Sequence, residues 1–177
     1  MKKLSHEEIS KMKPSVEDVK NKEKNEIYTL LDNVRSLHNV GAIFRTSDAV
    51  LIKKIFLCGI TGHPPRKEIS KTALGAEEIV EWEYNEDATE VIKDLKKKGV
   101  KIVAVELAKD SQIYHEANYD FPVCFIFGHE VLGISDDVMD LVDITVEIPM
   151  LGRANSLNIS TCYGIVVYDA LKKLQNA

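Results

Sequence analysis

The sequence alternates segments typical of buried strands with segments typical of helices, and this alternation limits the folds open to the chain. Residues 100–107, VKIVAVEL, and residues 121–128, FPVCFIFG, are near-continuous apolar runs, as expected for strands covered on both faces of a parallel sheet. Between such runs lie helical patterns, and residues 85–99, NEDATEVIKDLKKKG, place their apolar side chains on one helical face. The alternation predicts an α/β fold with an open, mostly parallel sheet and helices on both faces.

Length and the polar N-terminus predict one domain with a short appendage. Residues 27–177 contain all of the strand and helix alternation, and they are enough to bury a full core. Residues 1–26 are rich in Lys and Glu and are interrupted by Pro14, which predicts a helical or loosely ordered arm. The arm has no apolar run typical of a secretory signal, and no apolar segment reaches membrane-spanning length. We therefore expect a cytoplasmic protein that does not enter a membrane.

The three cysteines, Cys58, Cys124 and Cys162, lie far apart in apolar segments. No C-x-x-C pair or Cys/His cluster has the spacing of a metal site. The pattern predicts reduced, buried cysteines and no bound metal.

The charge of the chain is distributed unevenly. The formal net charge is -5, which disfavours simple electrostatic binding of nucleic acid. Residues 76–147, however, contain 18 acidic and 6 basic residues, whereas residues 29–75 contain 3 acidic and 7 basic residues. The basic residues of that second segment are Arg35, Arg45, Lys53, Lys54, Arg66, Lys67 and Lys71. A basic patch that binds nucleic acid and a mixed, solvated surface are equally compatible with this pattern.

The common nucleotide and hydrolase motifs are missing from the sequence. There is no G-x-G-x-x-G after a strand, no G-x-x-x-x-G-K-[ST] and no G-x-S-x-G. A dinucleotide-dependent dehydrogenase, a P-loop NTPase and an α/β-hydrolase are each disfavoured.

Hydrogen-bonding residues gather instead after three other strands. The first cluster, residues 33–49, is NVRSLHNVGAIFRTSDA and contains Asn39 and Arg45. If Asn39 caps a helix, Arg45 lies nearly two turns into it, and Gly41 lets a backbone or a phosphate approach closely. A plain helix cap and a surface ion pair are the simpler interpretations of Asn39 and Arg45.

The second and third clusters follow apolar runs later in the chain. In residues 125–135, FIFGHEVLGIS, Glu130 lies at the C-terminal end of a strand, where open α/β sheets place their ligands. A structural carboxylate that accepts loop N–H bonds is the alternative for Glu130. His129 is a candidate base, although a lone loop histidine is more often solvated. In residues 148–161, IPMLGRANSLNIST, either Asn155 or Ser156 can cap the last helix, with Asn158 in its first turn.

Together the three clusters resemble the motifs of the SpoU/TrmH family of RNA 2'-O-ribose methyltransferases, in the SPOUT superfamily. Asn39 and Arg45 match motif one, and Glu130 matches motif two. Motif three is matched by Ser156 and Asn158. Residues 70–78, SKTALGAEE, also resemble a family segment, and the resemblance covers roughly residues 28–175. Two departures are His129, where the family usually has Asn or Pro, and an arm too short for a separate RNA-binding domain, which leaves the substrate open.

The resemblance implies a fold, a cofactor and an assembly. The fold would have a C-terminal trefoil knot that forms the pocket for S-adenosyl-L-methionine (S-adenosylmethionine). The protein would be a homodimer with its site near the interface, and its substrate would be tRNA or rRNA. The cofactor would be held around Glu106, Leu107, Gly128, Ile148, Met150 and Leu157.

The resemblance also implies roles for the motif residues. Arg45 would act near the ribose 2'-hydroxyl and its adjacent phosphate, and Ser156 would contact ligand or substrate. Asn39, Glu130 and Asn158 would orient Arg45 and the loops. Because an arginine rarely gives up its proton, a phosphate clamp is a better role for Arg45 than a base.

Two other function classes compete with this interpretation. A non-catalytic RNA-binding module with the same fold predicts the loss of Arg45, Glu130 or Asn158, but all three are present. A nucleotide-binding protein unrelated to RNA predicts a phosphate loop, and no such loop is visible in the sequence.

Overall fold

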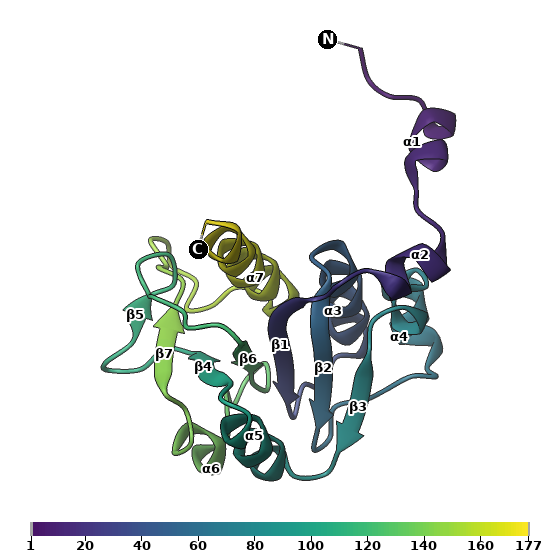
Figure 1. Cartoon of the computed structure of the whole chain (residues 1–177). Coiled ribbons are helices and arrows are strands. Elements are labelled where there is room, and N and C mark those ends of the chain that lie inside the picture. The colour runs from purple at the N-terminus through teal and green to yellow at the C-terminus, as the bar shows by residue number, and fades with distance from the viewer. Residues whose placement is uncertain (1, 177) are drawn as a thin grey trace.

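The computed structural model describes residues 2–176, and its seven strands pair in parallel throughout one sheet (Figure 1). The order across the sheet is β3-β2-β1-β6-β4-β7-β5. The strands are β1 Asn25–Asp32, β2 Ile52–Cys58, β3 Trp82–Asn85, β4 Lys101–Val105, β5 Gln112–Ile113, β6 Val123–Phe127 and β7 Ile144–Glu147. The predicted α/β fold with a parallel sheet is confirmed. The two-residue strand β5 was not predicted, because it is too short to show a pattern.

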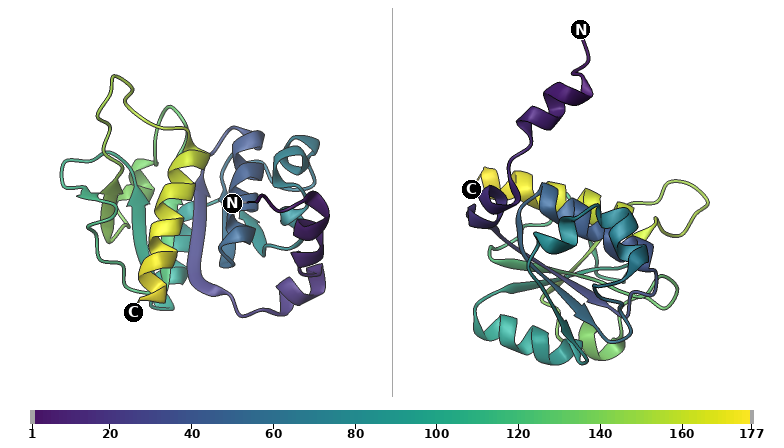
Figure 2. Two further views of the ribbon diagram at one scale, coloured as in Figure 1. Left: turned by 90° about the horizontal axis from the view of Figure 1, so that it is seen from above. Right: turned by 90° about the vertical axis from the view of Figure 1, so that its right-hand side faces the viewer.

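Helices cover both faces of the sheet, as predicted (Figures 1 and 2). One face packs against α3, α4 and α7, and the other packs against α5 and α6. The helices are α1 His6–Met12, α2 Val16–Asn21, α3 Leu37–Ala49, α4 Lys67–Ala73, the 3₁₀ turn η1 Ala76–Glu78, α5 Ala88–Lys97, α6 Asp136–Met139 and α7 Ile159–Gln175.

Strand β6 shows why the apolar runs of this sequence are almost uninterrupted. All five of its side chains are buried. Phe125 and Phe127 belong to the core beneath α3 and α7, whereas Cys124 and Ile126 belong to the core above α5. Removal from water makes each buried Phe or Ile side chain of this strand stabilise the fold by roughly 1.5–3 kcal/mol. Because helices cover both faces of the sheet at β6, side chains on either face of this strand lie in an apolar core.

The parallel pairing brings the predicted site segments to one edge of the sheet. Strand β1 pairs with β6, β6 with β4, and β4 with β7. The loops that follow these four strands therefore begin at the same edge. They comprise residues 33–36, 106–111, 128–135 and 148–158, which hold most of the residues singled out in the sequence.

The N-terminal arm consists of two short helices and a linker that lie outside the core. Ser5 and Ser15 cap α1 and α2, and each forms a reciprocal pair of hydrogen bonds with the acidic residue three positions later. Neither helix has a buried residue, and Figure 1 shows α1 well away from the sheet. Strand β1 begins at Asn25, two residues inside the predicted arm.

All three cysteines are free thiols. Cys58 and Cys124 are buried, as predicted, whereas Cys162 is only partly buried. Burial raises the pKa of the Cys58 thiol to about 12, so this thiol stays protonated at neutral pH. Within residues 2–176, no helix has both the length and the apolar character needed to cross a membrane.

Candidate active site

Glu130 joins the loop after β6 to the start of α3. Its Oε1 accepts hydrogen bonds from the backbone N–H of Ser36 and from Nδ2 of Asn39, each at 3.0 Å. Its Oε2 accepts from the backbone N–H of Arg35, also at 3.0 Å. Partial burial opposes ionisation of this carboxyl, but the N–H donors outweigh it and hold the pKa of Glu130 below its ordinary value. Glu130 therefore makes the contacts of a structural carboxylate that accepts loop N–H bonds.

Asn39 extends this connection to the third motif. Nδ2 of Asn158 donates to Oδ1 of Asn39 at 3.1 Å. Oδ1 of Asn158 in turn accepts from the backbone N–H and the hydroxyl of Ser160, at 2.9 and 2.6 Å. The structure thus brings Glu130, Asn39 and Asn158 together in one hydrogen-bonded chain, the carboxamide network, although Asn39 and Asn158 are 119 residues apart in the sequence.

The structure corrects both predicted helix caps. Helix α3 is capped by Ser36, whose Oγ accepts from the N–H of Asn39 at 3.3 Å, so Asn39 is the third residue of the helix. Helix α7 is capped by Asn158, and Asn155 and Ser156 lie in the loop before it. In each case the cap is the residue whose side-chain oxygen reaches the free N–H groups of the first turn. Because Ser36 performs the capping of α3, the side chain of Asn39 can serve the network instead.

Arg45 lies apart from this network. Its side chain is exposed on α3 and forms no hydrogen bond or ion pair within residues 2–176. Six residues of helix separate Arg45 from Asn39, which turns the two side chains to different faces. A direct contact that orients Arg45 through Asn39, Glu130 or Asn158 is therefore absent from the described part of the chain. The guanidinium is available to another molecule.

His129 shapes its own loop. Its Nδ1 accepts from the backbone N–H groups of Val131 and Leu132, at 3.0 and 3.3 Å. Its backbone also pairs with Gly133 through two hydrogen bonds of 2.9 Å. The turn is so tight that a Cβ at Gly128 would lie 2.3 Å from the backbone of Gly133, which has a φ of 73°. These contacts agree with a role in loop shape rather than with that of a base.

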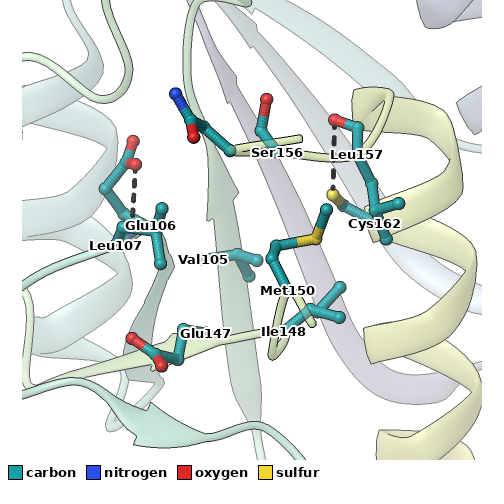
Figure 3. A pocket seen from close by; sticks show the side chains of 10 residues that line it. Val105, Glu106, Leu107, Glu147, Ile148, Met150, Ser156, Leu157 and Cys162 are labelled. Atoms are coloured by element: carbon teal, nitrogen blue, oxygen red, sulfur yellow. Dashed lines mark hydrogen bonds between the residues drawn. The ribbon is translucent and has the colours of Figure 1, made fainter. Parts of the chain in front are cut away.

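A pocket opens between the strand ends and the start of α7 (Figure 3). Its walls come from the end of β4, from the loop that joins β7 to α7, and from the first turn of α7. The lining residues are Val105, Glu106, Leu107, Glu147, Ile148, Met150, Asn155, Ser156, Leu157 and Cys162. An adjoining cavity of about 370 Å³ shares five of these residues and adds Gly128, Glu130 and Asn158. All six residues predicted to surround the cofactor, and Ser156, therefore line this pair of cavities.

Two carboxylates of the pocket are held by local contacts. Glu106 accepts hydrogen bonds from the backbone N–H groups of Leu107 and Ile134, at 3.0 and 3.1 Å, and so ties the loop after β6 to the end of β4. Glu147 accepts from the hydroxyl of Ser111. Glu147 was not predicted as a site residue, although its place at the C-terminal end of a strand was a usable signal. Cys162 was also missed, although it directly follows the third cluster, residues 148–161.

The chemistry of the pocket suits S-adenosylmethionine. Its walls are mainly apolar, as an adenine ring requires, and Glu106 and Glu147 supply negative charge for a ligand that has a sulfonium and an ammonium group. Among residues 2–176, no group of three or more His, Cys, Asp or Glu side chains could hold a metal ion.

Comparison with known proteins decides the family. Residues 26–168 match the family described as SpoU rRNA Methylase. The chain belongs to the SpoU methylase family. The resemblance inferred from the three motifs is confirmed.

Relatives and solved structures of this family span most of the chain. The tRNA (guanosine(18)-2'-O)-methyltransferase of Thermus thermophilus is 31% identical over 158 residues, which cover 89% of this chain and 80% of the relative. The TrmH/SpoU tRNA modifying enzyme of Aquifex aeolicus has a TM-score of 0.82 at 29% identity, over 91% of this chain and 81% of that one. An AdoMet-bound rRNA methyltransferase from Sinorhizobium meliloti has a TM-score of 0.79 at 29% identity, over 87% and 59% of the two chains.

Proposed function

We propose that this SpoU family member is an S-adenosylmethionine-dependent RNA methyltransferase that acts on a ribose 2'-hydroxyl of tRNA or rRNA. The observation that carries the proposal is the family match over residues 26–168, with the side chains of all three motifs gathered at one sheet edge. The names of the relatives agree, since they describe tRNA 2'-O-methyltransferases and an rRNA methyltransferase.

The reaction is an in-line displacement at a methyl carbon. When bound, S-adenosylmethionine supplies an electrophilic methyl group, and the ribose 2'-oxygen forms the new C–O bond as the C–S bond breaks. The protein has to align the hydroxyl with the pocket, and alignment supplies much of the rate in such reactions. Hydrogen bonds to Glu106 and Glu130 hold the loop after β6 against the end of β4 and against the start of α3. The entrance of the pocket therefore has a fixed shape.

Arg45 is the residue we assign to the substrate side of the reaction. Because a guanidinium is a poor base and a good bidentate donor, Arg45 binds the phosphate next to the reacting ribose instead of accepting the hydroxyl proton. The phosphate or water then takes the hydroxyl proton. The carboxamide network fixes the first turn of α3, and through the helix it fixes the base of the Arg45 side chain. Ser156, on the pocket wall, contacts cofactor or substrate.

The proposal includes a C-terminal trefoil knot and a homodimer. For the knot, the support is that three separate loops, after β4, β6 and β7, converge on one pocket in a SpoU family chain. For the dimer, the support is a set of exposed apolar side chains around the site. Val131 and Leu132 lie in the loop after β6, and Leu151, which is 98% exposed, lies in the loop after β7.

We also propose that residues 27–177 form the methyltransferase domain and that residues 1–26 form an arm outside it. The lack of buried residues in α1 and α2 supports this division. A cytoplasmic location, where tRNA and rRNA are found, fits three free thiols.

The first experiment is transfer of a tritiated methyl group from S-adenosylmethionine to unmodified bulk RNA, with tRNA and rRNA separated afterwards. We expect label in one fraction, and digestion to nucleosides should place it on ribose. Cofactor binding without any label transfer would favour the non-catalytic RNA-binding module instead.

Arg45→Ala provides the matching variant. We expect it to abolish transfer while the affinity for S-adenosylmethionine, measured by calorimetry, stays within a few-fold of the wild type. The reason is that Arg45 lies outside both cavities that surround the cofactor. Loss of cofactor binding in this variant would contradict the role assigned to Arg45.

A further inference from the structure

The basic side chains of α3 and α4 and of the loops before them have no acidic partner. Within residues 2–176, none of these side chains takes part in an ion pair or a hydrogen bond, and all of them are exposed. They are Arg35, Arg45, Arg66, Lys67 and Lys71. Some lysines elsewhere are paired, since Lys54 contacts Glu83 at 2.6 Å and Lys97 contacts Asp94 at 2.9 Å. Others within residues 2–176, such as Lys98 and Lys109, form no ion pair, so it is the clustering of unpaired cations that distinguishes these helices. The only acidic residues on the two helices are Asp48 and Glu68.

Close packing of α4 on α3 gathers four of these side chains. Thr72 Oγ1 donates to the carbonyl of His38 at 3.0 Å. A Cβ at Gly41 would lie 2.1 Å from Thr72 Oγ1 and 2.3 Å from the carbonyl oxygen of Ile69, so only glycine lets the helices approach this closely. Arg45 lies one turn after Gly41 on the same helical face. Arg45 therefore emerges beside α4, next to the point where the two helices meet.

Helix α4 turns its apolar face inward and its basic face to solvent. Ile69 and Ala73 are buried against the core. The opposite side forms a shallow groove, and three of its five lining residues are basic: Pro65, Arg66, Lys67, Ser70 and Lys71. We call Arg45, Arg66, Lys67 and Lys71 the basic ridge.

We propose that the basic ridge holds the RNA strand next to the methylated nucleotide, with Arg66, Lys67 and Lys71 binding its phosphates. This inference rests on the proposed function and adds to it three side chains outside the three family motifs, Arg66, Lys67 and Lys71. When the reacting ribose of an RNA strand lies at Arg45, the neighbouring phosphates of that RNA strand lie beside the groove of α4. The unpaired cations of this groove attract a polyanion.

The opposite face of the molecule argues for the same path. Helices α5 and α6 and their caps present six exposed carboxylates, Asp87, Glu90, Asp94, Asp136, Asp137 and Asp140, together with four exposed lysines, Lys93, Lys96, Lys97 and Lys98. That face therefore has mixed charge with a small acidic excess, whereas basic side chains predominate at the ridge, so a net charge of -5 does not prevent binding at the ridge. The loop into α4 also brings His63 to 5.0 Å from the ring of Tyr84, which is 44% exposed. Aromatic rings beside a phosphate path are typical of surfaces that bind RNA rather than acidic protein.

The test compares two triple variants with the same change of charge. One is Arg66→Gln/Lys67→Gln/Lys71→Gln on the ridge, and the control is Lys93→Gln/Lys97→Gln/Lys98→Gln on α5. Affinity for unmodified tRNA and rRNA transcripts is measured by fluorescence anisotropy at several salt concentrations, and affinity for S-adenosylmethionine is measured by calorimetry.

We expect the ridge variant to bind the transcript that wild type methylates about tenfold more weakly, and its salt dependence, the slope of log K against log salt, to fall by about 2. Its affinity for S-adenosylmethionine should not change, and the α5 control should match wild type in both. An unchanged RNA affinity and slope in the ridge variant, or an equal loss in the α5 control, would overturn the ridge while leaving the proposed function intact. Wild-type protein that neither binds nor methylates any transcript would overturn both.

Discussion

Asn39 both donates and accepts a hydrogen bond within the site, which restricts the residue types that can occupy its position. Its amide nitrogen donates to Glu130 at 3.0 Å, and its oxygen accepts from Asn158 at 3.1 Å. A carboxylate at this position could accept but not donate, and a hydroxyl is too short to bridge the two partners. The residue type thus follows from the need for one donor and one acceptor on a single planar group.

A comparison of Asn39→Asp with Asn39→Ala tests this geometry. We expect the Asp variant to be the less stable at pH 7, because it places a second carboxylate against that of Glu130. The difference should shrink below about pH 4, where one carboxyl of the pair takes up a proton and donates it. Melting temperatures of both variants across this pH range give the result, and equal stability at pH 7 would contradict the expected repulsion between the two carboxylates.

The wild-type protein should show the corresponding dependence on pH. The pKa of Glu130 in the folded state lies below its ordinary value of 4.5. The carboxylate therefore stabilises the fold above the unfolded-state pKa, and this contribution disappears as the pH falls through the folded-state value. Glu130→Gln removes this carboxylate, so it should flatten the acid part of the curve of melting temperature against pH. The measurement covers the same pH range as for the Asn39 variants.

Asn158 combines two functions at the N-terminus of α7. It caps the helix and it binds Asn39. We expect Asn158→Ala to lower the free energy of unfolding by about 1–2 kcal/mol through loss of the cap, and to weaken S-adenosylmethionine binding because the pocket wall begins at the same residue. Denaturant unfolding and calorimetry measure the two effects. Unchanged values in both would remove Asn158 from the site.

At the scale of elements, the contact between α3 and α4 depends on one glycine. Gly41→Ala should destabilise the protein by about 1–3 kcal/mol, because the new methyl group meets the backbone of α4 and not only a flexible side chain. Gly164→Ala on α7 is the control, since a Cβ there meets no atom of the chain within 4 Å. The control should be stabilised by about 0.5–1 kcal/mol through helix propensity, and chemical denaturation separates the two cases.

Elements also differ in how far the sequence predicts them. Strands β4 and β6 were predictable because burial on both faces leaves an unbroken apolar run. The caps were not, because several Ser and Asn residues stand within a few positions of each helix start, and the choice among them depends on the path of the preceding loop. Ser36, for example, turns its backbone N–H to Glu130, 94 residues away, and no local pattern can reveal such a contact.

In the site, too, residues that belong to sequence motifs were predictable, whereas contacts that depend on the fold were not. Motif residues and pocket residues were predictable from the resemblance, and the structure gathers nearly all of them at one edge of the sheet. Asn39, Glu130 and Asn158 were expected to orient Arg45 and the loops, and helical geometry shows that any such effect on Arg45 passes through the helix and not through a direct contact. The carboxylate of Glu147 went unnoticed because it belongs to no motif, although it lines the pocket.

At the scale of the whole molecule, the exposed apolar loops beside the site test the proposed dimer. We expect analytical ultracentrifugation of the wild type to give twice the mass of one chain. Val131→Asp/Leu132→Asp should shift the protein toward monomer, because these side chains are 78% and 81% exposed and would place charge in the interface. The control Leu74→Asp, at a 62% exposed position directly after α4, should leave the mass of the protein in solution unchanged. A monomeric wild type would contradict the proposal.

The late position of the pocket walls in the chain has a consequence for how the protein is made. The pocket needs residues 105–107 from β4, but it also needs residues 147–157 and Cys162, near the end of the chain. A nascent chain emerges from the ribosome N-terminus first, so β1, β2 and β3 can assemble while the pocket still has only one wall. The cofactor can then bind only after α7 has been released, and prematurely terminated chains would not sequester it.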